Sequence, residues 1–297
     1  MSKYSSISIV VSFFGLWIDS FFSHQVQIII GFLLIFSFGI LHGANDLLLI
    51  ENIKEKKDPI PFFKIVSYYA LVVLGGALLF YLLPWLVLVL FLIVSAYHFG
   101  EQQWQSLNQK ASKRFSVLFQ FIYGATILFL LFAFHLHEVQ KIIFQITKIS
   151  INTLHIITAL KIIVAILFIS GIYLYLKFDT LRKLLLTETL YLLIFIIIFK
   201  SSSLIWGFAL YFVLWHSIPS IIDQTKFLYG NYSFELFITY CKSALLYWGI
   251  SILGISVLYL VFKQEQLFNA LFFSFLAAIT FPHAIVITKM FSDKDKA

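Results

Sequence analysis

The chain has 297 residues, of which 61% are hydrophobic and only 12% are charged, and its mean hydropathy is +0.96. A soluble domain has about half apolar and about a quarter charged residues, so an ordinary soluble protein is excluded. The apolar excess extends over the whole length, which favours a polytopic membrane protein over a soluble one with a single anchor. The net charge of +7 does not indicate nucleic-acid binding, because the cations lie in short loops between apolar runs. The single cysteine, Cys241, excludes an intrachain disulfide and a thiolate metal cluster.

A helix needs about 20 apolar residues to cross a bilayer, and ten apolar runs follow one another along the chain. We expect spans at 5–22, 26–50, 62–83, 85–100, 115–134, 156–176, 184–199, 204–222, 236–262 and 267–290. Eight or nine spans would also fit, because two runs are short and Pro219 interrupts the eighth. The first run lacks a following cleavage site, so we expect a retained span. The sequence predicts one all-α transmembrane domain, a helical bundle over residues 1–297.

The basic residues predict the orientation of these spans. With ten spans and an internal N-terminus, sixteen lysines and arginines lie on the cytoplasmic side and five on the other. This bias follows the positive-inside rule, so both termini are expected in the cytoplasm. We expect the protein in the inner (plasma) membrane. The segment 135–155 is amphipathic, and we expect a helix lying on the outer membrane surface.

Four of the eight histidines lie inside expected spans, namely His42, His98, His216 and His283. Counted forward from the first three, the next lysine follows after 12, 12 and 10 residues, and from His283 it follows after 6 residues, or 11 to Lys294. At about 1.5 Å per residue, all four lie at similar depth in the cytoplasmic half of the membrane. A histidine within a span is costly and usually faces an interior site, so four at one level favour a metal site. Imidazole suits iron, copper, zinc and nickel, and the histidines alone do not choose among them.

The remaining histidines lie in or beside outer loops, where we interpret them as interfacial polar residues. They are His24, His135, His137 and His155.

Polar side chains follow two of the membrane histidines one helical turn later. They are Asn45 and Asp46 after the first, and Glu101 and Gln102 after the second. Positions i+3 and i+4 share a helix face, and a metal-bound histidine normally donates its other N–H to a carboxylate or carbonyl. We therefore expect Asp46 and Glu101 to support histidine ligands, more often one from another helix. Glu101 also fits a solvated residue at the membrane edge.

Two prolines accompany the other two histidines. Pro219 follows His216 by three residues, and Pro282 immediately precedes His283. A proline inside a helix removes a backbone hydrogen bond and favours a kink, so we expect irregular backbone beside both histidines. An ordinary kink, unrelated to a site, gives the same pattern.

Four motifs together resemble the bacterial Brp/Blh family of β-carotene 15,15′-dioxygenases. They are "GILHGANDLLLI", "SAYHFGEQQW", "YFVLWHSIPS" and "ITFPHAIV", in matching order from His42 to His283. The resemblance implies an integral membrane enzyme with a histidine-bound non-haem iron, Fe(2+). It implies cleavage of β-carotene at its central double bond by O₂ to give two all-trans-retinal, which microbial rhodopsins use.

The resemblance also implies roles for individual residues. The metal ligands would be His42, His98, His216 and His283, with Asp46, Glu101, Asn45, Gln102 and Ser220 around them. Family members often carry a second histidine where this chain has Ser220, so we expect only polar lining there. Four aromatic residues near the histidines, Tyr97, Trp104, Tyr211 and Trp215, are candidates for lining a polyene tunnel. No catalytic residue beyond the metal ligands is expected, because cleavage of an unactivated double bond by O₂ requires a redox metal.

Three other functions remain open from the sequence. A membrane lipid hydroxylase or desaturase would resemble clustered HxxxH and HxxHH motifs, which this chain lacks. A proton-coupled transporter would use Asp46, Glu101 and the histidines as an ion path, but inverted repeats are not evident. A haem-binding electron carrier is the third alternative.

Overall fold

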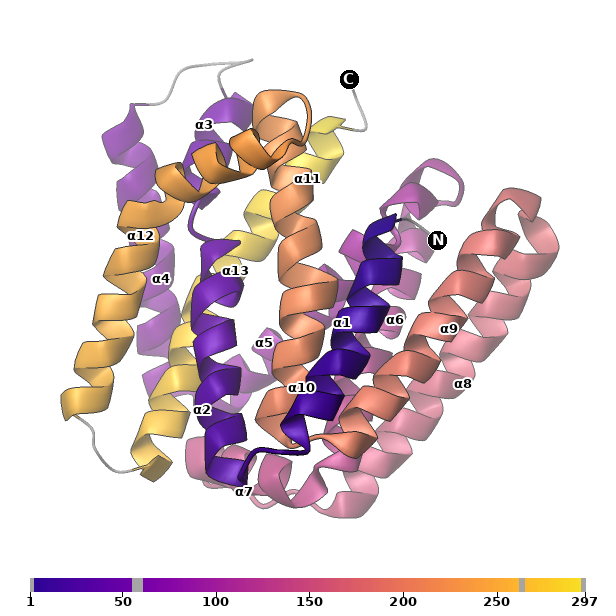
Figure 1. Ribbon diagram of the computed structural model, residues 1–297, viewed down its shortest axis with the longest axis horizontal. Helices are drawn as coiled ribbons and strands as arrows, with labels where there is room; N and C mark the ends of the chain where they lie inside the picture. The colour runs from indigo at the N-terminus through magenta and orange to yellow at the C-terminus, as the bar shows by residue number, and fades with distance from the viewer. Residues whose placement is uncertain (1–2, 55–60, 262–264, 295–297) are drawn as a thin grey trace. The chain divides into compact units, whose positions relative to one another are not determined.

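The computed structural model describes residues 3–54, 61–261 and 265–294, and all regular structure in these ranges is helical (Figure 1). Eight of the described helices are long and apolar enough to cross a membrane. The predicted all-α polytopic membrane fold is therefore confirmed. The chain divides into two compact units, and each combines segments that lie far apart in the sequence.

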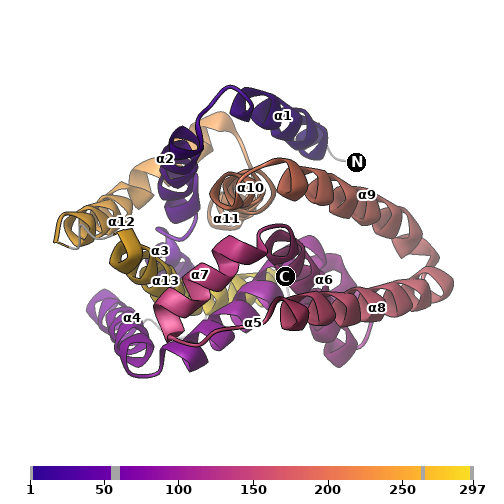
Figure 2. The ribbon, with the colours of Figure 1, turned by 90° about the horizontal axis from the view of Figure 1, so that it is seen from below.

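The first unit comprises Met1–Ile35, Ala96–Lys141 and Ile151–Ser217. Its helices are α1 (Lys3–Asp19), α2 (His24–Leu34), α6 (Lys113–Phe134), α8 (Thr153–Lys177), α9 (Asp179–Ser201) and α10 (Leu204–Tyr211), with the 3₁₀ turn η2 (Gln105–Gln109) and the π-helical η3 (Phe212–Ser217). The helices α6, α8 and α9 pack against one another, and Figure 2 shows α8 and α9 converging at the end where the chain turns from one to the other. The helix α10 packs against α2 and α9.

The second unit comprises Phe36–Ser95, Ile142–Ser150 and Ile218–Ala297. Its helices are α3 (Asp46–Lys54), α4 (Phe62–Leu82), α11 (Ile218–Tyr229), α12 (Phe234–Val261) and α13 (Glu265–Lys294). The helix α13 packs along α4 and α3, and α11 packs against α12 and α3. Three further elements begin in one unit and end in the other along the chain: η1 (Ile35–Gly39), α5 (Pro84–Gln103) and α7 (Leu136–Thr147).

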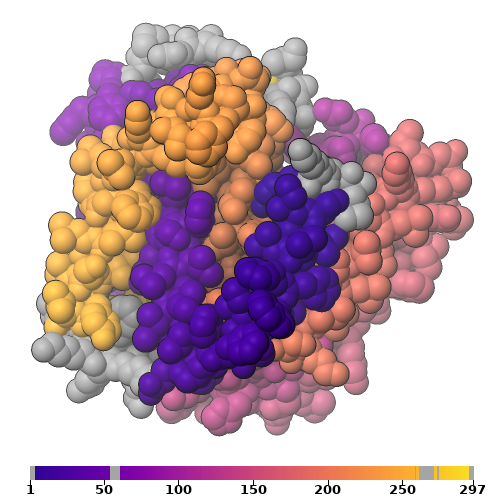
Figure 3. All heavy atoms as spheres, in the orientation of Figure 1, coloured from indigo at the N-terminus to yellow at the C-terminus, as the bar shows by residue number. Residues whose placement is uncertain are grey.

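The shorter apolar helix α1 has its polar and its large apolar side chains on different sides. Val10, Phe14 and Trp17 follow one another at helical spacing and are exposed, and the outer side of α1 is uncovered in Figure 3 (indigo). The polar side chains Ser8 and Ser12 are buried instead. Lipid offers no hydrogen-bond partners, so this arrangement, with the serines facing protein and the large apolar residues facing outward, suits a helix in an apolar environment.

The expected span over residues 26–50 is not a single helix, so that prediction is wrong. The helix α2 passes through the π-helical η1, residues 42–45 form turns, and α3 then begins at Asp46. The amides of Gly43 and Ala44 bond to the carbonyls three residues earlier, at 3.2 Å each, which tightens and ends the helix. The side chain of Asn45 then donates an N–H to the Tyr240 backbone carbonyl at 3.0 Å. The first two expected spans are therefore shorter apolar helices, and eight of the ten expected spans meet the length and composition of a membrane helix.

The amphipathic segment 135–155 is helical only in its first part. The helix α7 ends at Thr147, and Lys148 has a positive φ of 61°. The side chain of Asn152 then accepts a hydrogen bond from the Leu154 amide at the start of α8. The predicted place of this helix on the outer surface, and both termini in the cytoplasm, stay predictions. Four lysines in that charge count, Lys56, Lys57, Lys263 and Lys296, lie outside the described residues.

Two glycines allow α5 and α6 to approach closely in the first unit. A Cβ at Gly100 would lie 1.7 Å from the Gln120 carbonyl oxygen, and one at Gly124 would lie 1.9 Å from the Ala96 carbonyl oxygen. Both obstacles are backbone atoms, so a side chain at either position would have to push the helices apart.

We therefore expect Gly100→Ala to lower the free energy of unfolding by about 3 kcal/mol or more, because an overpacked helix contact cannot relax. The melting temperature of the detergent-solubilised protein should fall by roughly 5–10 °C. Gly249→Ala on α12 is the control, since no atom lies within 4 Å of its Cβ position. Equal melting temperatures for the two variants would contradict the close approach.

Candidate metal centre

The first unit holds a buried pair of histidines, His98 on α5 and His216 in η3. Their ring centroids lie 4.8 Å apart with an interplanar angle of 82°, and each side chain is at most 2% exposed. Phe212 stacks on His216 at 5.4 Å, and Phe99 contacts it at 4.7 Å. The aromatic rings surround the imidazoles with apolar surface and exclude water from this pair.

The local backbone explains how His216 is placed. It lies in the π-helical segment η3, which is the irregularity expected beside Pro219, and π-helical turns occur frequently at functional sites. Backbone carbonyl groups of this segment accept hydrogen bonds from side chains of other helices. Gln102 donates its Nε2–H to the His216 carbonyl at 3.0 Å, and the Tyr4 hydroxyl donates to the Leu214 carbonyl. The sequence-predicted residue Gln102 thus holds the backbone of a histidine.

The second unit holds a similar pair, His42 in the turn before α3 and His283 on α13. Their ring centroids lie 4.7 Å apart with an interplanar angle of 86°, and both side chains are buried. A ring nitrogen of each lies within 4.8 Å of one on the other. Gly43 lies next to this pair, and its Cβ position is 3.5 Å from His283 Nδ1, an ordinary contact distance.

Asp46 connects α3, α4 and α13 beside this second pair. Its Oδ1 lies 2.8 Å from His283 Nδ1, and its Oδ2 accepts a hydrogen bond from the Tyr69 hydroxyl at 2.8 Å. The His42 Nδ1 contacts the Gly39 carbonyl. Both imidazoles therefore direct Nδ1 to a protein oxygen, which assigns Nε2 as the nitrogen that a metal would bind.

A buried polar network around His42 was missed by the sequence analysis. Gln224 donates its amide to the His42 carbonyl at 2.8 Å and to Ser220 Oγ at 3.0 Å. The Tyr240 hydroxyl donates to Gln224 Oε1 at 2.8 Å. Gln224 follows Ser220 by four residues in the sequence, and that spacing was the available signal. Nothing in the local sequence marks Tyr240 or Tyr69 among fifteen tyrosines.

The other predicted polar residues lie as follows. Asn45 accepts a hydrogen bond from Ser243 at 3.0 Å, so it fixes the turn to α12. Glu101 accepts a hydrogen bond from Tyr97 at 2.8 Å and is only 2% exposed. The alternative of a solvated Glu101 at the membrane edge is therefore wrong. Because residues 42–45 form a turn, the shared helix face expected for His42, Asn45 and Asp46 is also wrong.

The four candidate tunnel aromatics have different surroundings in the first unit. Trp104 lines a cavity between α6, α8 and α9. Tyr211 and Trp215 pack in the core, both against Phe195, and Trp215 also donates its indole N–H to Ser12 at 3.0 Å. Tyr97 bonds to Glu101. A role for these residues along a substrate path stays a prediction.

The outer-loop histidines differ from the two pairs. His24, His137 and His155 are exposed, as expected for interfacial residues. His135 is 7% exposed, and burial lowers the pKa of its imidazole while the nearby Glu138 opposes that change. Burial therefore favours the neutral ring.

The donor atoms of each pair fit a divalent transition metal. Two imidazoles lie nearly perpendicular in each unit, and in the second unit carboxylate and carbonyl oxygens face their Nδ1 atoms. Neutral imidazole nitrogen suits iron, copper, zinc and nickel, and the oxygens at Nδ1 fix the ring orientation that metal binding needs. The residues therefore fit a metal of this class.

Comparisons with known proteins assign the chain to one family. The sequence model described as Beta-carotene 15,15'-dioxygenase matches residues 33–291, a range that includes all four histidines of the two pairs. No curated protein matches the chain, and no solved structure matches it.

The network around His42 predicts a graded loss of stability. Gln224→Leu removes the donor to the His42 carbonyl and the acceptor of the Tyr240 hydroxyl, so we expect unfolding to become easier by about 2–3 kcal/mol. Ser220→Ala removes one bond and should cost about 1 kcal/mol. Thermal unfolding of the detergent-solubilised variants measures both, with the exposed Thr239→Ala as a control. A Gln224→Leu protein as stable as the control would show that the network contributes nothing.

Proposed function

The chain belongs to the β-carotene 15,15′-dioxygenase family, and we propose that it cleaves β-carotene at the central 15,15′ double bond with O₂ to give two all-trans-retinal. The observation that carries the proposal is the pair of buried, perpendicular imidazoles in each unit, within the matched range. The substrate is an apolar polyene that dissolves in the bilayer. An enzyme made of membrane helices meets this substrate where it resides, which in this proposal is the plasma membrane.

The proposed metal is one ferrous ion bound by His42, His98, His216 and His283, with residues 1–297 acting as a single catalytic domain. Three observations support this: the similar depth of the four histidines in the sequence, the chemistry of the two pairs, and the family match. When bound, ferrous iron supplies the redox chemistry that lets O₂ react with an unactivated double bond.

The surrounding residues have positioning roles in this proposal. Asp46 accepts the Nδ1–H of His283 and is itself held by Tyr69, so the ring keeps the tautomer that offers Nε2 to the metal. The Gly39 carbonyl does the same for His42. Phe99 and Phe212 cover the His98 and His216 pair and keep water away from it. No protein acid or base is needed, because the substrate carries no proton that must be moved before cleavage.

The alternatives are less well supported. A lipid hydroxylase or desaturase, a proton-coupled transporter and a haem carrier would each require a family other than the one that matches over residues 33–291. The carboxylate of Asp46 also bonds to both His283 and Tyr69, an arrangement that holds a ring in place. No observation specifically favours any of the three.

Production of retinal tests the reaction directly. In a β-carotene-producing bacterium, expression of the chain should bleach the yellow colour and yield retinal, measured by chromatography of cell extracts. Alanine at His42, His98, His216 or His283 should each abolish retinal, because each variant removes one proposed metal ligand.

The matched controls are His24→Ala and His155→Ala, which remove exposed imidazoles and should leave retinal production unchanged. Iron content of the purified proteins is measured in parallel. Absence of retinal in cells whose membranes contain the wild-type protein would refute the proposed reaction, and a fully active histidine variant would remove that residue from the ligand set.

The contact between Asp46 and His283 predicts a change in metal affinity that does not depend on activity. Asp46→Asn should weaken iron binding about 10–100-fold, because the support of one ligand ring loses its charge, and Tyr69→Phe should have a smaller effect. Competition of purified protein against an iron chelator measures the affinity. The control Glu51→Gln makes the same charge change on α3 and should leave the iron affinity unchanged. Equal iron affinities for Asp46→Asn and Glu51→Gln would contradict the positioning role.

A further inference from the structure

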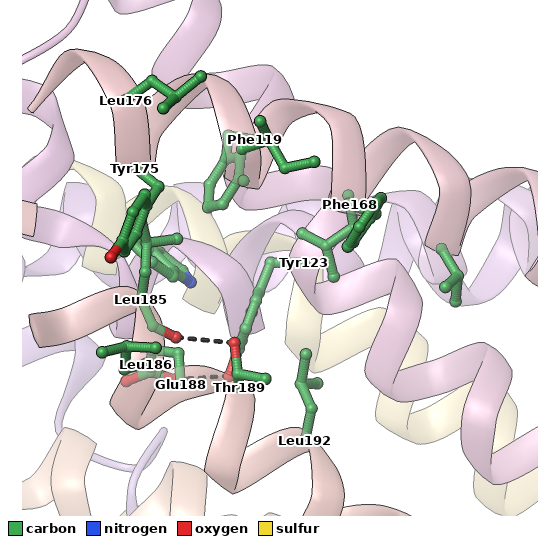
Figure 4. A pocket seen from close by; sticks show the side chains of 15 residues that line it. Phe119, Tyr123, Phe168, Tyr175, Leu176, Leu185, Leu186, Glu188, Thr189 and Leu192 are labelled. Atoms are coloured by element: carbon green, nitrogen blue, oxygen red, sulfur yellow. Dashed lines mark hydrogen bonds between the residues drawn. The ribbon is translucent and has the colours of Figure 1, made fainter. Parts of the chain in front are cut away.

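A cavity of about 410 Å³ lies in the first unit among α6, α8, α9 and the end of α5. Figure 4 shows its labelled lining, which includes Phe119 and Tyr123 from α6, Phe168 and Tyr175 from α8, and Glu188 and Leu192 from α9. The lining contains none of the four buried histidines. We propose that this cavity binds a lipid alcohol, meaning a long apolar molecule that carries one hydroxyl group.

The walls indicate an apolar ligand that enters from the bilayer. Most lining residues are leucine, isoleucine, valine or aromatic, and none is a lysine, arginine or histidine. Phe168 and Leu176 belong both to the lining and to the exposed side of α8, at 67% and 70% exposure. The volume falls within the range of roughly 300–1,000 Å³ that small-molecule pockets occupy. Because no cation lines the cavity, a fatty acid or a phosphate headgroup would be bound without charge compensation.

Two buried polar groups specify the polar end of the ligand. Trp104 is 1% exposed, and its indole N–H has no hydrogen-bond partner among the described residues. Glu188 is 4% exposed and accepts a hydrogen bond from the Tyr123 hydroxyl at 2.6 Å. A buried donor without an acceptor is costly, so an oxygen atom of the ligand would stabilise the Trp104 indole.

A hydroxyl group meets both requirements at once. Its oxygen accepts from the indole N–H, and its proton can be donated to the Glu188 carboxyl group. A ketone or aldehyde oxygen can only accept, and a carboxylate would repel the carboxyl group when that group is ionised. β-Carotene is a hydrocarbon without any such group, so this site goes beyond the proposed reaction and is independent of it.

Binding to the full-length protein in detergent tests the proposal, with geranylgeraniol as the probe and the corresponding hydrocarbon without its hydroxyl as the comparison. Native mass spectrometry and titration should give one bound alcohol per chain, and the hydrocarbon should bind at least about five-fold more weakly, the factor that one ordinary hydrogen bond supplies. Trp104→Phe should weaken this preference, because the aromatic ring remains while the N–H that makes one of the two hydrogen bonds to the hydroxyl is lost. Equal binding of alcohol and hydrocarbon, or a preference that Trp104→Phe leaves unchanged, would overturn the proposal.

A pair of neighbouring substitutions locates the ligand. Leu192→Trp fills the cavity and should abolish binding of the alcohol, whereas Leu193→Trp adds the same side chain at an exposed position outside the lining and should not. Unchanged binding to Leu192→Trp would place the alcohol elsewhere and refute the site. His283→Ala should retain alcohol binding while losing iron, which separates this proposal from the proposed dioxygenase reaction.

Discussion

Lipid offers no hydrogen-bond partners, and this constraint determines where every polar side chain of the protein can lie. In α1 the serines face protein and the large apolar residues face outward. The same constraint acts on the buried histidines, on Asp46 and on Glu101, which are costly in an apolar environment unless protein groups surround them. Around His42 and His283, the polar side chains of Asp46, Tyr69, Gln224 and Tyr240 are therefore joined by hydrogen bonds.

The backbone is irregular at two of the four histidines. This irregularity leaves backbone carbonyl groups without their helical partners, and side chains of the protein donate hydrogen bonds to them. His216 lies in a π-helical segment and His42 in a turn. Gln102 donates to the His216 carbonyl, and Gln224 donates to the His42 carbonyl. Non-helical backbone at membrane depth is tolerated only where protein or an internal cavity surrounds it. In each unit, the side-chain amide of a glutamine thus donates a hydrogen bond to a backbone carbonyl of the irregular segment.

Much of this fold and part of the site could be predicted from the sequence. Long apolar runs predict the eight long helices, because hydropathy over about 20 residues dominates the choice of structure in lipid. The break at residues 42–45 could not be predicted, because "GILHGANDLLLI" is apolar enough to continue a helix, and only the structure shows that the amides of Gly43 and Ala44 bond to carbonyls three residues earlier. Tyr69 and Tyr240 also escaped prediction, since their partners lie 23 and 16 residues away.

The buried histidines could be predicted as a set, because imidazole is rare and costly inside a span, whereas their ring geometry required the structure. Trp104 illustrates the opposite case. Its place near the histidines made it a candidate for a tunnel, but only the folded chain reveals that its buried indole N–H has no hydrogen-bond partner among the described residues, in a cavity that Glu188 and Tyr123 also line. Contacts between residues far apart in sequence decide what such a side chain can bind.

X-ray absorption at the iron edge of the purified, iron-loaded protein tests the central claim most directly, because it counts the imidazole nitrogens around the metal. One iron per chain with four imidazole ligands is the expected result, and it would mean that both histidine pairs serve the same ion. A spectrum with two imidazoles per iron, or two equivalents of iron bound per chain, would show that the pairs act separately and would contradict the proposed centre.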